Sequence, residues 1–316
     1  MRYCLIFLVL LACGVMGAQA QANAAIFERG LQQVADKEFT SAIASFSEYA
    51  KKEPTEAAAP FNIGLCYYSL ERYGDALSYF QKASLLKPDY TDAYLYMGNA
   101  LDSMGRYSEA VAAYSRALEL DPRNAEIYSE LGVAHLKHKD YRAAGTSYEK
   151  CISIEPTNDR CLASLGRVYN AESRFADARL VLGKATELNP ENAQTFFDLG
   201  NAFYNDGRYA ESIARYKRAT ELSPKFKTAL RYLGDAYANL RQNDLAISAY
   251  QQALAVDPKF SGAIYGLGKV YIAKRDRDRA ATQIATLKEI DPAKAVELQL
   301  AWQTAFSVTP SAISRP

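Results

Sequence analysis

Apolar and polar positions along this chain form a pattern that repeats every 34 residues. With the first residue of each repeat numbered 1, apolar residues recur at positions 4, 7 and 11, as at Tyr94, Met97 and Leu101. This spacing marks one face of a helix. A second stripe follows, in which position 20 is small in all eight repeats. Position 24 is aromatic in most repeats, at Phe80, Tyr114, Tyr148, Tyr216 and Tyr250. Each repeat is therefore predicted to form two antiparallel helices.

Proline and glycine recur in the same frame. Position 32 is proline in every repeat, at Pro54, Pro88, Pro122, Pro156, Pro190, Pro224, Pro258 and Pro292. Position 8 is glycine in every repeat, at Gly30, Gly64, Gly98, Gly132, Gly166, Gly200, Gly234 and Gly268. Proline lacks a backbone N–H and should end the second helix. Glycine lowers helix propensity, so its recurrence predicts that the backbones of the two helices approach closely there. Position 34 is Asn124, Asn158 or Asn192 in three repeats, and each should cap the next helix.

These residues resemble the tetratricopeptide repeat, whose pattern is an aromatic, Leu-Gly, Tyr, Ala, an aromatic and Pro within 34 residues. The repeats would occupy residues 23–56, 57–90, 91–124, 125–158, 159–192, 193–226, 227–260 and 261–294. The resemblance implies an all-α, right-handed solenoid of eight helix-turn-helix repeats. The departures are mild: Asn243 and Arg277 replace a usual aromatic, and Leu182 stands at position 24 of the fifth repeat. A degenerate last repeat is typical of the end of a solenoid.

The two ends of the chain do not follow the repeat. Residues 1–20 combine Arg2, an apolar run and Ala18-Gln19-Ala20, which predicts a secretory signal peptide cleaved after Ala20. The segment Leu10 to Cys13 resembles a lipobox, so lipid attachment at Cys13 is the alternative. The apolar run is short for a membrane span. Residues 295–306 are predicted to form a capping helix over the last repeat, and residues 307–316 a disordered tail.

Three cysteines follow the expected cleavage site. Cys151 and Cys161 lie on neighbouring predicted helices, so they could form a disulfide in an oxidising compartment. The alternative is two small packed residues, because position 27 is alanine in five other repeats. Cys66 is expected to be packed.

Composition and motifs argue against catalysis and against nucleic acid. The formal net charge is +1, without the basic face of a nucleic-acid-binding protein. The two histidines, His135 and His138, have no third ligand in phase, so no metal site is expected. The Gly-Leu-Gly-Lys run ending at Lys269 lies inside a helix and lacks the spacing of a phosphate loop. No cofactor and no enzymatic activity are predicted.

In tetratricopeptide proteins, positions 2, 5, 9 and 12 of the first helix line a concave groove, and the resemblance implies a peptide-binding groove here. In repeats 1 and 2 these positions are apolar and include Phe27, Leu31, Val34, Phe61, Leu65 and Tyr68. In repeats 3 and 4 they are acidic and polar and include Asp92, Asn99, Asp102, Glu126 and Ser129. In repeats 5 to 8 they are basic and amide-rich and include Arg160, Arg167, Asn170, Asn201, Tyr204, Arg231, Asp235, Tyr265 and Lys269.

The expectation is an exported, non-enzymatic scaffold or adaptor of the bacterial periplasm that binds a protein or peptide, with no membrane span in the mature chain. Two alternatives stay open. One is a lipid-anchored factor in outer-membrane or pilus assembly. The other is a structural protein that forms homo-oligomers through its apolar first repeats. The sequence does not name the partner, because function lies in sites added to a fold.

Overall fold

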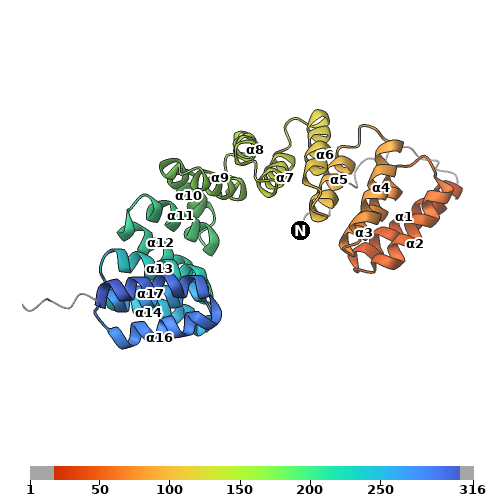
Figure 1. Ribbon diagram of the computed structural model, residues 1–316. Helices are drawn as coiled ribbons and strands as arrows, with labels where there is room; N and C mark the ends of the chain where they lie inside the picture. Colours follow the sequence, from red (N-terminus) through yellow and green to blue (C-terminus); the bar gives the residue numbers. More distant parts are fainter. Residues whose placement is uncertain (1–17, 307–316) are drawn as a thin grey trace, which may run out of the picture. The chain divides into compact units, whose positions relative to one another are not determined.

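The computed structural model describes residues 18–306, and in this range the chain forms seventeen α-helices. This confirms the all-α prediction of helix pairs followed by a capping helix (Figure 1). The body of the expected signal peptide, Cys13 and the expected disordered tail lie outside the described residues. None of the helices within residues 18–306 is both long enough and apolar enough to cross a membrane.

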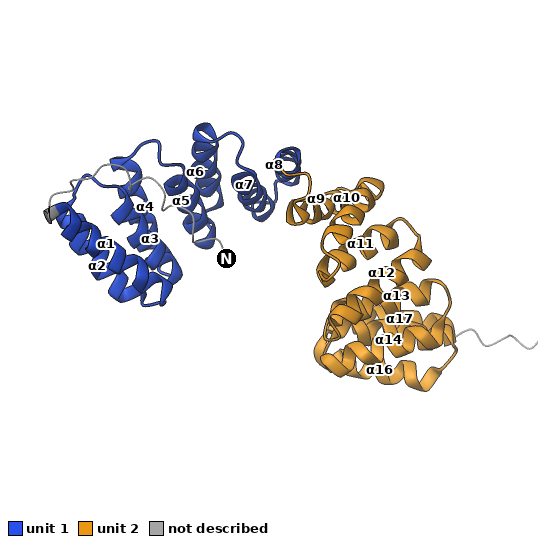
Figure 2. Ribbon diagram, turned by 180° about the vertical axis from the view of Figure 1, so that it is seen from behind, with its two compact units in different colours: residues 1–154 blue, residues 155–316 orange. Residues whose placement is uncertain are grey.

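The chain divides into two compact units, residues 1–154 and 155–316 (Figure 2). The helices of the N-terminal unit are α1 (Ala18–Ala35), α2 (Phe39–Lys52), α3 (Ala58–Ser69), α4 (Tyr73–Leu86), α5 (Thr91–Ser103), α6 (Tyr107–Leu120), α7 (Ala125–Lys137) and α8 (Tyr141–Ile154). Those of the C-terminal unit are α9 (Asp159–Ala171), α10 (Phe175–Leu188), α11 (Ala193–Asn205), α12 (Tyr209–Leu222), α13 (Lys227–Asn239), α14 (Asn243–Val256), α15 (Ser261–Ala273), α16 (Arg277–Ile290) and α17 (Pro292–Phe306).

The boundaries of the helices follow from local sequence. Asn124, Asn158 and Asn192 accept hydrogen bonds through Oδ1 from the backbone N–H three residues on, which confirms them as N-caps. The second helix of every repeat ends two residues before the proline, which agrees with the predicted role of proline in ending it. The turn between paired helices has a positive φ at position 15 in every repeat, with glycine there only at Gly105 and Gly207.

The recurrent glycine has a different cause from the one expected. A Cβ on Gly30 would lie 2.6 Å from Cε1 of Phe46, the position 24 residue of the same repeat, and Gly234 meets the Tyr250 ring in the same way. The aromatic ring of the second helix, rather than its backbone, therefore occupies the space beside the glycine. Position 8 must be small because it faces a large side chain, which is the position 24 residue in repeats 1 to 7 and Leu298 of α17 in repeat 8.

The core consists of these rings and the small residues around them. Phe46, Phe80, Tyr114, Tyr216 and Tyr250 are all buried. At the C-terminal end, α17 begins at Pro292, earlier than the expected residue 295, because proline suits the first turn of a helix. It packs on α15 and α16 and covers a cluster of Ile264, Ile284 and Leu287 through Leu298. Trp302 also belongs to this packing, and its indole N–H donates to the carbonyl of Arg277.

Candidate functional site

The candidate site is the set of side chains at positions 2, 5, 9 and 12 of the first helices, here called the first-helix stripe. In the N-terminal unit it lies on α1, α3, α5 and α7, and in the C-terminal unit on α9, α11, α13 and α15. The residues of this stripe differ in how much of their side chain remains exposed, and that decides which of them can meet a partner.

Position 9 is coupled to the buried aromatic at position 24. The hydroxyl of Tyr114 donates to Asn99 Oδ1 at 2.7 Å, and that of Tyr216 donates to Asn201 Oδ1 at 2.8 Å. The same hydrogen bond joins Tyr250 to Asp235 Oδ1 at 2.6 Å. A buried hydroxyl needs an acceptor, and position 9 supplies it in repeats 3, 6 and 7. Repeat 4 is an exception, because its buried Tyr148 is combined with Val133 at position 9.

Repeats 1 and 2 show the apolar version of this pair. Position 24 is Phe46 or Phe80, which has no hydroxyl, and position 9 is Leu31 or Leu65. Sequence reasoning missed this pairing, although the joint change of the two positions was visible. Asn99 and Asn201 therefore have a structural role, but each keeps an amide Nδ2 that donates to no group in residues 18–306.

The apolar stripe of repeats 1 and 2 is largely packed. Phe61 is 6% exposed, and its ring centroid lies 4.8 Å from that of Tyr90 and 5.6 Å from that of Tyr96. This corrects the expectation that Phe61 offers binding surface, because neighbouring aromatics cover it. Phe27 is half-buried and packs on Phe46. Tyr68 is also half-buried, like Leu31 and Leu65.

The acidic stripe of repeats 3 and 4 contains one exposed acid, Glu126. Asp102 forms an ion pair with Lys137 through Oδ2, while its buried Oδ1 has no partner among the described residues. Burial raises the pKa of Asp92, Lys87 acts in the opposite direction, and Asp121 adds to the increase. Asp92 and Asp102 therefore have different charged neighbours, and they do not act as one acidic site.

The stripe of repeats 5 to 8 keeps its basic side chains near solvent. Arg160, Arg167 and Lys269 are exposed. Arg167 donates through Nη2 to Ser164 Oγ at 2.9 Å. Lys269 Nζ lies 5.6 Å from the ring centroid of Tyr265.

Arg231 and Tyr204 are held more firmly. Arg231 Nη1 pairs with Asp235 Oδ2 at 2.5 Å, and its guanidinium lies 3.7 Å from the ring centroid of Tyr232. The hydroxyl of Tyr204 accepts a hydrogen bond from Asn239 Nδ2 at 3.0 Å. Both residues are half-buried, and their partners fix their orientation.

Asp198 was missed by sequence reasoning because it stands at position 6, outside the stripe. It is only 6% exposed, and its Oδ1 accepts from Gln194 Nε2 at 2.9 Å. Asn170 Nδ2 donates to the backbone carbonyl of Asp198 at 2.9 Å, so the side chain of Asn170 contacts α11 at this residue. Burial raises the pKa of Asp198 to about 6, although the Gln194 hydrogen bond and the charge of Arg167 act in the opposite direction. No sequence signal separates this acid from the other carboxylates.

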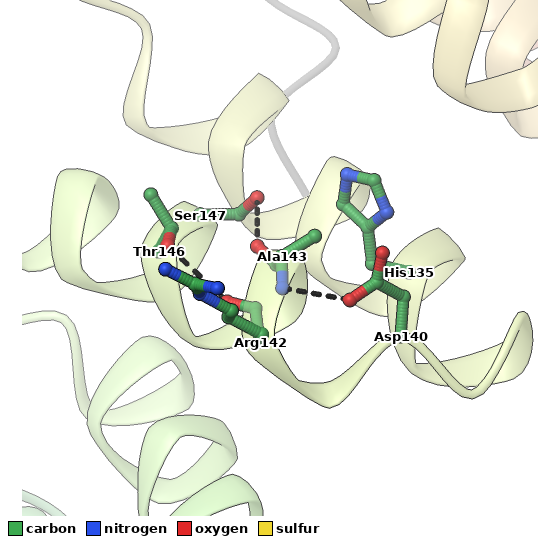
Figure 3. Close-up of a pocket in the computed structure, with 6 residues that line it drawn as sticks. All are labelled: His135, Asp140, Arg142, Ala143, Thr146 and Ser147. Carbon is green, nitrogen blue, oxygen red and sulfur yellow. Dashed lines mark hydrogen bonds between the residues drawn. The ribbon is translucent and has the colours of Figure 1, made fainter.

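An open depression beside α8 brings together His135, Asp140 and Ser147 (Figure 3). These residue types suggest nucleophilic catalysis, but their hydrogen bonds do not. Asp140 Oδ1 accepts from the backbone N–H of Ala143, and the hydroxyl of Ser147 donates to the carbonyl of Ala143. Burial lowers the pKa of His135, Asp140 raises it and His138 lowers it further. In the described part of the chain, no hydrogen bond joins His135 to the acid or to the serine, so the proton relay of a catalytic triad is missing.

Residues 18–306 contain no group of three or more His, Cys, Asp or Glu side chains arranged to hold a metal ion. Cys151 and Cys161 are buried and are both disulfide-bonded. Cys66 is a buried free thiol, and burial raises its pKa to about 11. A thiol with this pKa is a poor nucleophile.

Family models match the chain over much of its length. A model described as tetratricopeptide repeat matches residues 27–90, 164–226 and 197–264. Other models with tetratricopeptide or TPR repeat descriptions match residues 98–139, 125–158 and 241–301. Each of these models describes a repeat rather than a catalytic family. No curated protein matches the chain significantly.

Solved structures share the fold. PilF of Pseudomonas aeruginosa is 22% identical, with a TM-score of 0.58, over 66% of this chain and 96% of that chain. YrrB, described as a TPR protein with an unusual peptide-binding site, is 19% identical, with a TM-score of 0.53, over 58% of this chain and 95% of that chain. The Cut9–Hcn1 complex gives 21% identity and a TM-score of 0.58 over 78% of this chain and 48% of that chain.

The repeated helix pairs and the matching models agree on one architecture. The chain belongs to the tetratricopeptide repeat family, whose fold serves as a protein-binding scaffold.

Proposed function

We propose that this protein is an exported, non-enzymatic scaffold of the cell envelope that holds an extended segment of a partner protein along the first-helix stripe. The observation that carries the proposal is the exposure and orientation of the stripe side chains in repeats 5 to 8. There, Arg167 and Lys269 remain exposed, and Asn201 presents an amide whose orientation is fixed by Tyr216.

The chemistry of this stripe suits an extended protein chain. The Nδ2 group of Asn201 can donate to a backbone carbonyl, because its Oδ1 is already engaged by the tyrosine. The half-buried tyrosine Tyr204 can contribute contact area with little loss of side-chain entropy. Arg167 and Lys269 can pair with acidic side chains of the bound segment. YrrB, which has the same fold, is described as peptide-binding, and this supports a peptide as the type of ligand.

The experiment is affinity capture from an envelope extract of the source organism, with bound proteins identified by mass spectrometry. A variant that combines Arg167→Glu and Lys269→Glu reverses two charges on the stripe. The matched control combines Lys184→Glu and Lys288→Glu, which reverses two exposed charges on the second helices α10 and α16. We expect a partner that the wild type and the control retain and the stripe variant loses. If the stripe variant captures the same proteins as the wild type, the stripe is not the binding surface.

Export is part of the proposal and has its own test. Cleavage after Ala20 would give a mature chain that starts at Gln21, whereas a lipid anchor would retain residues 13–20 and add acyl mass at Cys13. Intact mass of the chain purified from cell fractions separates these two forms. A chain that keeps Met1 and stays in the cytoplasm would overturn both.

Self-association through the apolar first repeats is not the function that we propose. Phe61 packs inside the N-terminal unit, so it is not available to a second copy. Light scattering at high protein concentration measures whether the protein self-associates. A stable oligomer would make self-association a candidate function again.

A further inference from the structure

The C-terminal unit contains a buried acid that the packing of the repeat does not explain. Asp198 lies on α11 with 6% of its surface exposed, and a carboxyl in such a place normally has a cationic partner or several donors. Within residues 18–306 the only donor to this carboxyl is the neutral amide of Gln194, at 2.9 Å. Its second oxygen, Oδ2, therefore has no donor.

A second acceptor beside Asp198 also has no partner. Asn170 on α9 donates its Nδ2 to the Asp198 carbonyl, and this leaves its buried Oδ1 without any hydrogen bond in the described part of the chain. Asn170 Oδ1 is unfavourable in the free protein, because it has lost its hydration and accepts no hydrogen bond in return. Asp198 Oδ2 likewise accepts no hydrogen bond from the described residues. Such a site is complementary to a group that carries several N–H donors.

Arg167, the cation whose charge acts on Asp198, does not fill this role. Arg167 is exposed, and it uses Nη2 for Ser164 Oγ rather than for the carboxyl of Asp198. Its charge acts on Asp198 from a distance, and the pKa of Asp198 stays raised because burial has the larger effect. The groups that act on this carboxyl are thus Gln194 on its own helix and Arg167 on α9, while Asn170 on α9 contacts the backbone of Asp198.

We propose that Asp198 and Asn170 form a subsite that receives a cationic, N–H-rich side chain, a lysine or an arginine, of the bound protein segment. This inference rests on the proposed function, because it assigns the chemistry of a site that combines the stripe residue Asn170 with Asp198 beside the stripe. The incoming cation pairs with Asp198 Oδ2 and supplies a donor to Asn170 Oδ1. The exposed guanidinium of Arg167 turns toward the flanking residues of the segment, where it favours an acid and disfavours a second cation.

The subsite gives the buried carboxylate of Asp198 a role. A charged pair that forms out of water is directional and selective, so it fixes the register of an extended segment that otherwise makes repetitive backbone contacts. The pair forms only when Asp198 is ionised. Binding is therefore expected to weaken as the solution is acidified.

The test uses a displayed library of random twelve-residue peptides, selected on the immobilised full-length mature protein at pH 7.5. Asp198→Asn keeps the shape of the side chain and an acceptor for Gln194, and it removes the charge. Glu187→Gln is the matched control, since it removes an exposed acid from α10, away from the stripe. Circular dichroism and thermal melting verify that all three proteins are folded.

The wild type and the control should select peptides enriched in lysine or arginine at one position, and Asp198→Asn should select peptides without that enrichment. Replacing the enriched residue by norleucine in the best peptide should weaken binding to the wild type about 10- to 100-fold and leave binding to Asp198→Asn almost unchanged. A lysine-to-arginine exchange in the same peptide shows which cation the subsite prefers.

The possible failures are distinguishable. If the wild type selects no peptide family at all, the proposed function is wrong and the subsite is wrong with it. If it selects peptides without a basic preference, or if that preference survives Asp198→Asn, the subsite is wrong and peptide binding stands.

Discussion

The hydroxyl of Tyr216 donates a hydrogen bond to Oδ1 of Asn201 at 2.8 Å, so a core residue of α12 orients a stripe residue of α11. Tyr216 is fully buried, whereas Asn201 is partly exposed. One side of the asparagine amide thus belongs to the core, and the other side can face a partner. This pair therefore connects the interior of the repeat to the first-helix stripe, which is the proposed binding surface.

Breaking this pair should reduce stability, and replacing both members should restore it. Asn201→Leu alone leaves the buried hydroxyl of Tyr216 without an acceptor and should cost about 1–3 kcal/mol. Adding Tyr216→Phe recreates the Leu65 and Phe80 pair of repeat 2, so most of the loss should be recovered. Thermal and urea unfolding of the two single variants and the double variant measures the coupling. Additive effects of the two changes would show that the hydrogen bond contributes nothing.

The same substitution at two glycines should have opposite effects. In Gly200→Ala, the new Cβ would lie 2.5 Å from Cε1 of Tyr216, and the overpacking should cost about 1–3 kcal/mol. Gly183 lies inside α10 with nothing within 4 Å of an added Cβ. Gly183→Ala should therefore raise stability by about 0.5–1 kcal/mol through helix propensity. Melting temperatures of the two variants check the sign, and a stabilised Gly200→Ala would contradict the packing argument.

Asp198 should make stability depend on pH. Burial raises the pKa of Asp198 from its ordinary value of 3.8 to about 6 in the folded chain, so the folded state binds a proton more tightly than the unfolded state. The stabilising effect of that proton is complete below about pH 4 and is lost as the pH rises through about 6. The penalty above that range is on the order of 3 kcal/mol.

Asp198→Asn should remove this penalty, because the amide stays neutral. The variant should be more stable than the wild type at pH 7.5, and the difference between them should shrink between pH 6 and pH 4. Melting curves at several pH values for both proteins measure this. Parallel pH profiles would show that Asp198 is not the group responsible.

The packing of the capping helix α17 on the last repeat should depend on Leu298 and not on Leu300. Leu298 is 0% exposed and packs on Gly268 and the cluster of Ile264 and Ile284. Leu298→Ala should cost about 2–5 kcal/mol, most of it felt in the last repeat. Leu300 is 65% exposed, so Leu300→Ala should change stability by no more than about 0.5 kcal/mol. Hydrogen exchange of α15 and α16 reports the local effect, and equal exchange in the two variants would contradict the assignment of Leu298 as the contact that holds the cap.

The sequence by itself determined the type of fold, because helix-forming patterns are local. Apolar spacing, proline at position 32 and asparagine at position 34 each act within a few residues, so their effects could be predicted before any packing was known. The turn at position 15 was less visible, since only Gly105 and Gly207 mark a positive φ that the other repeats adopt with larger residues.

Only the tertiary structure decided which residues are free to bind. The position of Phe61 in the repeat predicts a surface residue, but Tyr90 and Tyr96 cover its ring. The sequence predicts Asn201 as a ligand contact, but its Oδ1 accepts a hydrogen bond from the hydroxyl of Tyr216. Asp198 is an ordinary acid in the sequence, and it becomes a candidate site because it is buried and its carboxyl accepts a hydrogen bond only from the neutral amide of Gln194 within residues 18–306. Burial and hydrogen-bond partners arise from contacts between helices, and a periodic pattern within one helix does not encode them.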